Sequence, residues 1–481
     1  MNSPRPLTNF VGGRRCEPTG SVLALTDPRT GVAFGHAAVS GPDEVDHALR
    51  TAEAAFRGFR RTTPAERQTA LLCLADALED GAEEFAEAEC RETGKSRHQM
   101  LQDEIPQCAD QLRFFAGAAR LPEGAASGEY APGHSSLVRR EPVGVCAQIT
   151  PWNYPLMMAV WKIAPAVAAG NTTVVKPAET TPTTTVMLAE LANRFLPPGV
   201  VNVVLGDRET GRLLIGHPIP ALVSLTGSTR AGVEVARAAA DDLKLTHLEL
   251  GGNAPALVFE DADVQAAAEG IAAAGFYNAG QDCTAATRVL VQAGVREALV
   301  KALTGTAAAL TGGPGAAPGA EPDVGPLNSA AQLGRVLGLL ARLPDRAFVH
   351  TGGHRVGDCG YHLAPTVVSG LRQEDEIVQE EIFAPVLTVQ EFTTEAEGVR
   401  LANDQPYGLA ASVWTSDHSR VLRTTAELEF GAVWVNTHGV LTAEMPHGGF
   451  KHSGHGKDLS AYGLADYTRV KHVMSSLTDR A

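Results

Sequence analysis

The sequence predicts a two-lobed α/β protein, because strand-like and helix-like patterns alternate along a long chain of ordinary composition. Short β-rich runs at 143–149, 172–177, 200–206 and 221–227 are each followed by an Ala-rich or Leu-rich helical pattern. Such alternation indicates βαβ units, in which helices cover both faces of a parallel sheet. The 481 residues correspond to about three domain-sized units. Hydrophobic residues make up 44% of the chain and charged residues 20%, which excludes a disordered or fibrous protein.

The part of the chain before the first of these strands is predicted to be helical. Residues 45–59 place their apolar side chains on one helical face. A second helix is expected to begin at Thr63, with Pro64 in its first turn and Glu66 closing a capping box. The most apolar stretch, 155–170, is interrupted by a lysine and a proline and is too short to span a bilayer.

The second half repeats the alternation. Its β-rich runs lie at 257–261, 287–292, 364–369 and 432–436, with helical patterns between them. The Gly- and Pro-rich stretch 311–326 is predicted to be an exposed surface loop, because patterned sequence resumes on both sides of it.

Charge and cysteine usage narrow the class of protein. Forty basic and fifty-five acidic residues give a net charge of −15, which argues against a nucleic-acid or anionic-membrane partner. The first ten residues show no charged stretch followed by an apolar core, so we expect no secretory signal and a cytoplasmic location. No two of the seven cysteines lie within three residues of each other, which favours reduced thiols.

One cysteine has neighbours that suggest chemistry. Cys283 lies between a helix expected to begin near Asp263 and the strand at 287–292, on a turn that would present its sulfur at the end of a sheet. A buried, inert thiol is the alternative. Glu249 in LELGG and Asn153 in PWNYP offer a carboxylate base and an amide donor, the remaining parts needed for acyl chemistry. The histidines form no HxxxH or HExxH pair, and we expect no metal site.

Seven short motifs follow one another in a fixed order. They are PWNYP (151–155), KPAE (176–179), LTGSTRAG (225–232), LELGG (248–252), GQDCTAATR (280–288), EEIFAPV (380–386) and GGFKHSG (448–454). With these motifs the sequence resembles the aldehyde dehydrogenase superfamily along almost its whole length. NAGQDCTA around Cys283, EMPHGG at 444–449 and GKDLSAYGLADYT at 456–468 are most similar to the bacterial γ-aminobutyraldehyde dehydrogenases.

The resemblance implies roles for individual residues. Cys283 matches the family's nucleophile, Glu249 its general base and Asn153 its oxyanion donor. NAD is the implied cofactor, because a carboxylate at Glu179 accepts hydrogen bonds from a ribose 2′-hydroxyl and repels a 2′-phosphate, although Lys176 softens that discrimination. The positions that match cofactor contacts are Trp152, Lys176, Glu179, Gly227, Ser228, Glu381 and Phe383.

The implied substrate is an aminoaldehyde such as 4-aminobutanal, whose positive charge calls for carboxylates or aromatic faces. Glu104 and Asp282 are the candidate acids at a pocket entrance, with Tyr154, Trp161 and His447 lining the tunnel. A solvated surface charge is the alternative for each acid. A betaine-aldehyde or broad aliphatic aldehyde dehydrogenase, a CoA-acylating relative, and a non-catalytic structural protein on the same fold are the competing functions.

The resemblance also implies a division of the chain. Residues 1–123 and 143–251 are expected to form the NAD-binding domain and 252–467 the catalytic domain, both Rossmann-like. The segments 124–142 and 468–481 are expected to form a small β arm that adds strands to a neighbouring subunit, in a homodimer or homotetramer. At two other positions the sequence departs from the family pattern, with Asn253 in place of a common Lys and Ala384 in place of a common Gly.

Overall fold

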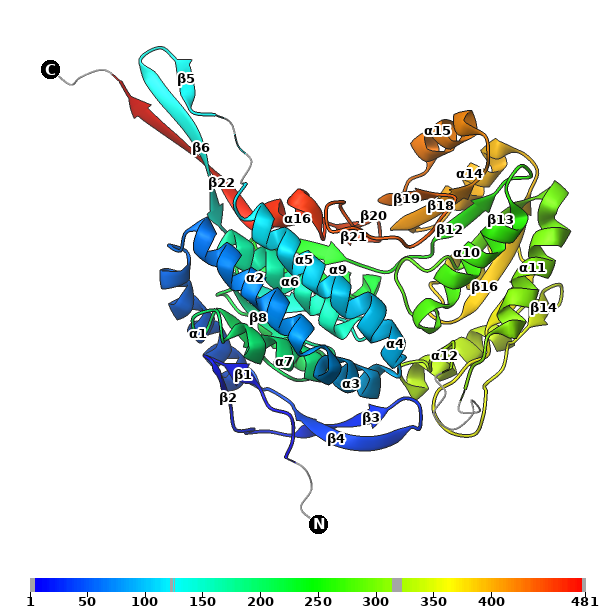
Figure 1. Cartoon of the computed structure of the whole chain (residues 1–481), viewed down its shortest axis with the longest axis horizontal. Helices are drawn as coiled ribbons and strands as arrows, with labels where there is room; N and C mark the ends of the chain where they lie inside the picture. The colour runs from blue at the N-terminus through cyan, green and yellow to red at the C-terminus, as the bar shows by residue number, and fades with distance from the viewer. Residues whose placement is uncertain (1–4, 122–123, 125, 314–321, 478–481) are drawn as a thin grey trace.

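The chain folds into two α/β halves, each built around its own sheet, with a narrow β arm projecting from the first half (Figure 1). The computed structural model describes residues 5–121, 124, 126–313 and 322–477. Half of the expected loop at 311–326, namely 314–321, lies outside these residues. The α/β class predicted from the sequence is confirmed. In the described part of the chain, no helix has the length and apolarity needed to cross a membrane.

The first half is built on an eight-stranded sheet in the order β2-β1-β9-β8-β7-β10-β11-β21. The five strands from β9 to β11 run parallel, and the four strands predicted between 143 and 227 are all among them. The strands are β1 (Phe10–Val11), β2 (Arg14–Arg15), β7 (Val145–Ile149), β8 (Thr172–Lys176), β9 (Val201–Val203), β10 (Leu222–Thr226), β11 (Leu245–Glu249) and β21 (Gly454–His455). A separate hairpin precedes them, made of β3 (Val22–Asp27) and β4 (Val32–Ala38).

Helices cover both faces of this sheet. One face packs against α1 (Pro42–Phe59), α8 (Arg208–Gly216) and α9 (Thr229–Ala240). The other packs against α2 (Pro64–Asp80), α3 (Ala82–Thr93), α5 (Ile105–Ala118), α6 (Pro155–Ala169) and α7 (Thr183–Ala192). Between α3 and α5 lie the short helix α4 (Arg97–Gln99) and the π-helix η1 (Met100–Glu104).

The local signals explain where the predicted helices begin. The hydroxyl of Thr63 accepts from the N–H of Glu66, whose carboxylate accepts in return from the N–H of Thr63. The capping box predicted from the sequence is therefore confirmed. The apolar stretch at 155–170 is the helix α6, which is buried on all sides. A helix that is apolar all round belongs in a protein core, and Lys162 is accommodated there by donating to the Ser224 hydroxyl at 2.9 Å.

The second half carries a seven-stranded sheet in the order β14-β15-β16-β13-β12-β18-β19, parallel except for β14. The strands are β12 (Pro255–Val258), β13 (Arg288–Gln292), β14 (Phe348–Thr351), β15 (Thr366–Ser369), β16 (Val386–Phe392), β18 (Ala410–Trp414) and β19 (Ala432–Val435). Its helices are α10 (Val264–Phe276), α11 (Arg296–Ala309), α12 (Ala330–Ala341), α13 (Glu376–Gln379), α14 (Glu395–Asn403) and α15 (His418–Glu427), with the 3₁₀ turns η2 (Tyr277–Gly280) and η3 (Ala293–Val295). The four strands predicted in this half are confirmed.

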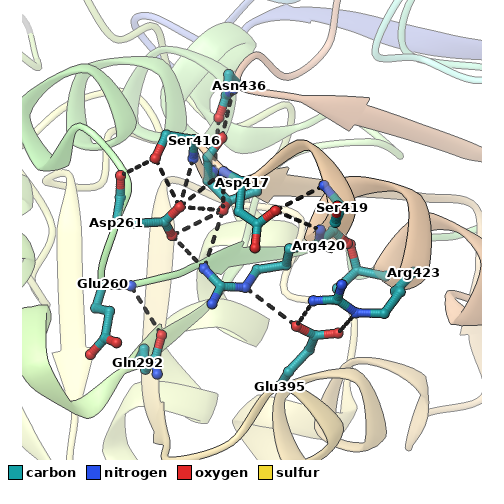
Figure 2. A network of polar contacts seen from close by, with 12 residues as sticks. Glu260, Asp261, Gln292, Glu395, Ser416, Asp417, Ser419, Arg420, Arg423 and Asn436 are labelled. Carbon is teal, nitrogen blue, oxygen red and sulfur yellow. Dashed lines mark hydrogen bonds and ion pairs between the residues drawn. The ribbon is translucent and has the colours of Figure 1, made fainter.

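A polar network joins the ends of two neighbouring strands of this sheet (Figure 2). Asp261, just beyond β12, accepts from the backbone N–H groups of Ser416 and Asp417, just beyond β18. The guanidinium of Arg420 reaches both Asp261 and Glu395, and so ties α15 to the start of α14. These contacts fix the outer end of the half, away from the residues that the sequence predicts to be functional.

The chain returns to the first half near its end. β21 pairs antiparallel with β11, and α16 (Ser460–Asp466) contacts α5 and α6. The two-stranded pair of β17 (Tyr407–Gly408) with β20 (Phe450–Lys451) holds this segment to the second half. The expected boundary at 467 therefore differs from the structure, because residues 454–466 belong by their hydrogen bonds and packing to the first half.

The arm is a three-stranded antiparallel sheet of β5 (Gly128–Ala131), β6 (His134–Pro142) and β22 (Thr468–Ser476). The segments expected at 124–142 and 468–481 pair with each other along nearly the whole of β6, and the arm extends away from the body (Figure 1). Apolar side chains are exposed on it, among them Tyr130, Val470 and Met474.

Candidate active site

A cavity of about 950 Å³ is lined by side chains from both halves. Its walls come from the loop between β7 and α6, the start of α9, the end of β11, and the segments around 283, 381 and 447. Of the residues predicted to act in catalysis or to contact cofactor or substrate, all but Lys176 and Glu179 line it. Those that do are Glu104, Trp152, Asn153, Tyr154, Trp161, Gly227, Ser228, Glu249, Asp282, Cys283, Glu381, Phe383 and His447.

The loop that carries Cys283 has an unusual backbone. After α10 ends, Asn278, Ala279 and Gly280 have positive φ angles of 47°, 57° and 67°. A Cβ on Gly280 would lie 2.2 Å from the carbonyl oxygen of Ala384, so only glycine allows this approach. A Cβ on Gly252 would in the same way lie 2.1 Å from the carbonyl oxygen of Cys283. These glycines let the nucleophile loop pack against the base loop.

Cys283, Glu249 and His447 converge in the cavity. The sulfur, a carboxylate oxygen and a ring nitrogen all lie within 4.8 Å of one another. Burial and the nearby carboxylates, Glu249 first among them, raise the pKa of the Cys283 thiol well above its ordinary value. At neutral pH the thiol is therefore protonated, and its attack on a carbonyl requires a base, which Glu249 is placed to provide.

Asn153 lies at the end of β7, beside the Cys283 loop. Its Nδ2 donates to the backbone carbonyl oxygen of Gln281 at 3.0 Å, and its backbone carbonyl oxygen accepts from Nδ2 of Asn278 at 3.0 Å. A side-chain amide has two N–H groups, so one remains for a ligand after the bond to Gln281. Asn153 thus joins the first half of the molecule to the loop of the nucleophile.

A second wall of the cavity has the features of a dinucleotide site. Ser228 is the N-cap of α9, and its side chain accepts from the N–H of Ala231, so the N-terminus of a twelve-residue helix faces the cavity. Helix N-termini attract anions such as a pyrophosphate. Glu381 is half-buried and accepts from the N–H of Gly252 at 2.9 Å, and loss of solvent around its carboxylate raises its pKa to about 7.

The two aromatic residues of this wall lie together. Phe383 has a φ of 55°, and its ring meets that of Trp152 edge to face with centroids 5.3 Å apart. Gln332 donates to the carbonyl oxygen of Phe383 at 2.8 Å, and Arg335 donates to that of Glu381 at 3.1 Å. These two residues of α12, which the sequence analysis missed, hold the strained loop in place and line the cavity themselves.

Lys176 and Glu179 lie beyond the cavity wall, at the end of β8. The Lys176 ammonium donates to the carbonyl oxygens of Pro177 and Gly206, and its burial lowers its pKa. Glu179 is exposed. Because β8 neighbours β7, both residues lie at the same carboxyl edge of the sheet as the cavity.

Comparison with known proteins decides the family. The model of the aldehyde dehydrogenase family matches residues 16–473. The chain belongs to the aldehyde dehydrogenase family. An aldehyde dehydrogenase mutant from Bacillus cereus is 35% identical with a TM-score of 0.95, covering 98% of this chain and 97% of its own. A betaine aldehyde dehydrogenase mutant from Staphylococcus aureus, solved in complex with NAD⁺, is 31% identical with a TM-score of 0.95 over 99% of both chains. PnpE from Pseudomonas sp. WBC-3 is 33% identical with a TM-score of 0.95 over 99% of both chains.

The structure of this aldehyde dehydrogenase accounts for its two departures from the family pattern. Asn253 is buried, donates to the carbonyl oxygen of Val378 at 2.8 Å and accepts from the Thr287 hydroxyl at 2.9 Å. It therefore links the base loop to β13 and to the segment that precedes Glu381. Ala384 is fully buried among apolar side chains and is not among the residues with a positive φ. A methyl group at this position therefore needs no special backbone conformation.

The position of Glu104 in the structure differs from the one predicted. It was predicted as an acid at a pocket entrance, but its side chain is buried and accepts from Lys95 at 2.6 Å and from Gln99 at 3.0 Å. Lys95 also lies 3.4 Å from Glu89. Glu104 faces inward because it shares the buried side of the π-helix η1 with Met100. Burial raises the pKa of Glu104.

The other substrate candidates form a polar and aromatic wall. Tyr154 donates to Asp282 at 2.7 Å, and the Thr284 hydroxyl and N–H donate to the other oxygen of that carboxylate. The aldehyde dehydrogenase also has Asp103 and Tyr277 on this wall, with the tyrosine hydroxyl 3.3 Å from the Asp103 carboxylate. Sequence reasoning missed this second pair, although Asp103 is adjacent to Glu104.

Trp161 and His447 complete the wall. Their rings meet edge to face at 5.2 Å, and the indole N–H donates to Gln111 at 2.9 Å. His438 was also missed. It is buried, its ring nitrogens lie 2.8 Å from the Ser412 hydroxyl and 2.7 Å from the Thr284 carbonyl oxygen, and burial lowers its pKa to about 4. A neutral His438 thus supports the turn that follows Cys283.

Proposed function

We propose that this NAD-dependent aldehyde dehydrogenase oxidises an aminoaldehyde, with 4-aminobutanal as the leading candidate, to the carboxylate. The observation that carries the substrate class is the pairing of acids with tyrosines on the cavity wall, Asp103 with Tyr277 and Asp282 with Tyr154. Carboxylates and aromatic faces both attract an ammonium group. Cys283, Glu249 and Asn153, on the same cavity wall, would carry out the oxidation.

The reaction begins with Cys283. Glu249 takes the proton of the thiol, and the sulfur attacks the aldehyde carbon to give a tetrahedral thiohemiacetal. Asn153 donates its free N–H to the oxygen that gains negative charge. NAD, when bound, supplies the acceptor for the hydride that leaves this carbon. The substrate carbonyl then remains on Cys283 as a thioester.

Hydrolysis of the thioester depends on Glu249. Glu249 first releases the proton of the thiol to solvent. Its carboxylate then takes a proton from water, the resulting hydroxide adds to the thioester carbon, and the thiolate of Cys283 leaves with formation of the carboxylic acid. A carboxylate oxygen of Glu249 lies within 4.8 Å of the Cys283 sulfur, and this proximity lets one base serve both steps.

The cofactor fits the second wall of the cavity. The helix N-terminus at Ser228 offers backbone N–H groups to the pyrophosphate, and Glu381 offers carboxylate oxygens to ribose hydroxyls. Trp152 and Phe383 border the nicotinamide end. At the other end, Glu179 favours NAD over NADP, because its carboxylate would repel a 2′-phosphate.

Replacing Asn153 with Ala should lower kcat by about 10²- to 10³-fold, the cost of losing one oxyanion donor. KM should change little, because this interaction strengthens only as negative charge develops. Steady-state NADH formation measures both parameters. A parent-like kcat would remove Asn153 from the mechanism.

A quaternary substrate is the second candidate, since one of the similar structures is a betaine aldehyde dehydrogenase. The rings of Tyr154, Trp161, Tyr277 and His447 are among those that line the same cavity. A quaternary ammonium has no N–H to donate, whereas a primary ammonium has three. The hydrogen-bonding carboxylates therefore favour the primary amine.

The replacement Asp103→Asn tests the substrate class. An exposed or half-exposed charge contributes about 1 kcal/mol or less, so the preference for 4-aminobutanal over butanal should fall by up to about fivefold, mainly through KM. Asp110→Asn, at an exposed position on α5, is the matched control and should keep the preference. Glu104→Gln is a poorer probe, because it would unbalance the buried contact with Lys95.

Ionic strength provides the second arm of this test. Salt screens an electrostatic preference, so the ratio of kcat/KM for the two aldehydes should decline as salt is added. Equal kcat/KM values for 4-aminobutanal and butanal at low salt would overturn the aminoaldehyde assignment. Aldehyde oxidation as such would be unaffected by that result.

We also propose that the enzyme assembles with copies of itself through the arm. A narrow sheet with apolar side chains on its surface is marginally stable alone, and a neighbouring sheet would cover it. Val470→Asp should therefore shift the mass measured by sedimentation equilibrium toward that of one chain. The control Leu243→Asp, at an exposed apolar position outside the arm, should leave it unchanged. A monomeric parent protein at micromolar concentration would contradict the proposal.

A further inference from the structure

Cys283, His447 and Glu249 together present the ligand types of a zinc site. Thiolate sulfur, imidazole nitrogen and carboxylate oxygen are the three donors that Zn²⁺ takes from proteins. Here one donor atom of each kind lies within 4.8 Å of the other two, and all three residues line the same cavity. We propose that the catalytic cavity binds Zn²⁺ reversibly through these three residues, and that the bound ion switches the enzyme off.

The spacing of the three donor atoms suits such an ion. Zn²⁺ binds sulfur at about 2.3 Å and nitrogen or oxygen at about 2.0–2.2 Å, so the donors of a tetrahedral site lie about 3.5 Å apart. Nε2 of His447 and Oε1 of Glu249 already lie 3.7 Å apart. The widest separation is at most 4.8 Å, so a contraction of about 1.3 Å or less, by rotation of side chains, brings it into range.

The hydrogen bonding of these residues gives a second, independent indication. Oε1 of Glu249, one of the proposed ligand atoms, is buried and finds no hydrogen-bond partner among the described residues. Buried polar atoms without partners are uncommon in proteins, and a ligand often accounts for them. The edge-to-face contact with Trp161 holds the imidazole ring beside Glu249.

Binding of the ion displaces one proton. The thiol of Cys283 releases its proton to solvent as the sulfur–zinc bond forms, and no electron is transferred. Three protein ligands leave a fourth position for water. The ion is then bound to the nucleophile Cys283 and to the base Glu249 at the same time. Inhibition should therefore be competitive with the aldehyde and reversed by a chelator. Mg²⁺, which prefers oxygen ligands, should not inhibit.

Co²⁺ is the probe for the site, because a cobalt–thiolate bond gives a charge-transfer absorption that a cobalt–oxygen site lacks. Titration of the full-length, tag-free protein with CoCl₂ should produce this band at one equivalent, and ZnCl₂ should abolish it by displacement. The replacement Cys283→Ser should remove the band. The replacement His447→Asn should weaken Co²⁺ binding by more than about tenfold, because loss of a residue that only hydrogen-bonds a metal ligand already costs about that much. The controls Cys359→Ser and His452→Asn, both at exposed positions, should retain the absorption band.

Alkylation gives a readout that does not depend on catalysis. Zn²⁺ should slow the reaction of Cys283 with iodoacetamide, followed by mass spectrometry of the cysteine's peptide, and this protection should be lost in His447→Asn. Absence of the thiolate band in the parent protein, or its persistence in Cys283→Ser, would overturn the proposal. Zinc inhibition that is equally strong in His447→Asn would place the ion elsewhere and would also overturn it. None of these outcomes depends on which aldehyde is the substrate.

Discussion

Replacing Cys283 with Ala should abolish aldehyde oxidation. The sulfur forms the covalent bond to the substrate, and none of the described side chains that line the cavity is a second thiol. The affinity for NAD should stay close to that of the parent protein, because the cofactor wall is built from Ser228, Glu381 and their neighbours. Steady-state NADH formation measures the first effect, and NAD titration followed by protein fluorescence measures the second.

The matched control is Cys359→Ser, which removes an exposed thiol and should retain parent activity. Parent-like turnover by Cys283→Ala would show that another group attacks the aldehyde. A joint loss of activity and NAD binding would indicate that the substitution disturbs the fold, and circular dichroism would reveal that.

The replacement Glu249→Gln should change the kinetics in a different way. Acylation of Cys283 can proceed without this base once the thiol ionises, so one equivalent of NADH per active site should appear before turnover stalls at the thioester. Because burial raises the pKa of Cys283, most of the thiol is protonated at neutral pH, and the rate of the burst should increase as the pH rises. Stopped-flow absorbance of NADH measures the amplitude and the rate.

Glu260→Gln, at an exposed position beyond β12, is the control and should turn over continuously. Steady turnover of Glu249→Gln at the parent rate would exclude Glu249 as the base that activates water. Complete absence of a burst, even at high pH, would show that acylation itself requires Glu249.

Local patterns in the sequence were sufficient to predict the framework. Alternating β-rich and helical runs identified β7 to β10, and Thr63 with Glu66 marked the start of α2, because such signals depend on neighbouring residues. The motifs placed Glu249 and Asn153 at or just after the ends of strands, and Cys283 in the turn that precedes β13. In the structure these three residues lie on the wall of one cavity.

The features that the sequence did not predict depend on contacts between distant segments. The return of residues 454–466 to the first half is set by pairing of β21 with β11, some two hundred residues away in the chain. The burial of Glu104 follows from a π-helix and from Lys95, neither of which has a sequence signal of its own. Asp103 and Tyr277 become neighbours only when the two halves are assembled, and His438 meets Thr284 across 154 residues of chain within the second half.

The central claim is that oxidation proceeds through an acyl group on Cys283, and intact-protein mass spectrometry tests it most directly. Glu249→Gln would be mixed with NAD and 4-aminobutanal and quenched in acid after the burst, then compared with a sample that lacks NAD. The account predicts that the mass increases by one aminobutanoyl group per chain, located on the peptide that contains Cys283, only when NAD is present. NADH formation with no covalent adduct, or an adduct on another residue, would contradict it.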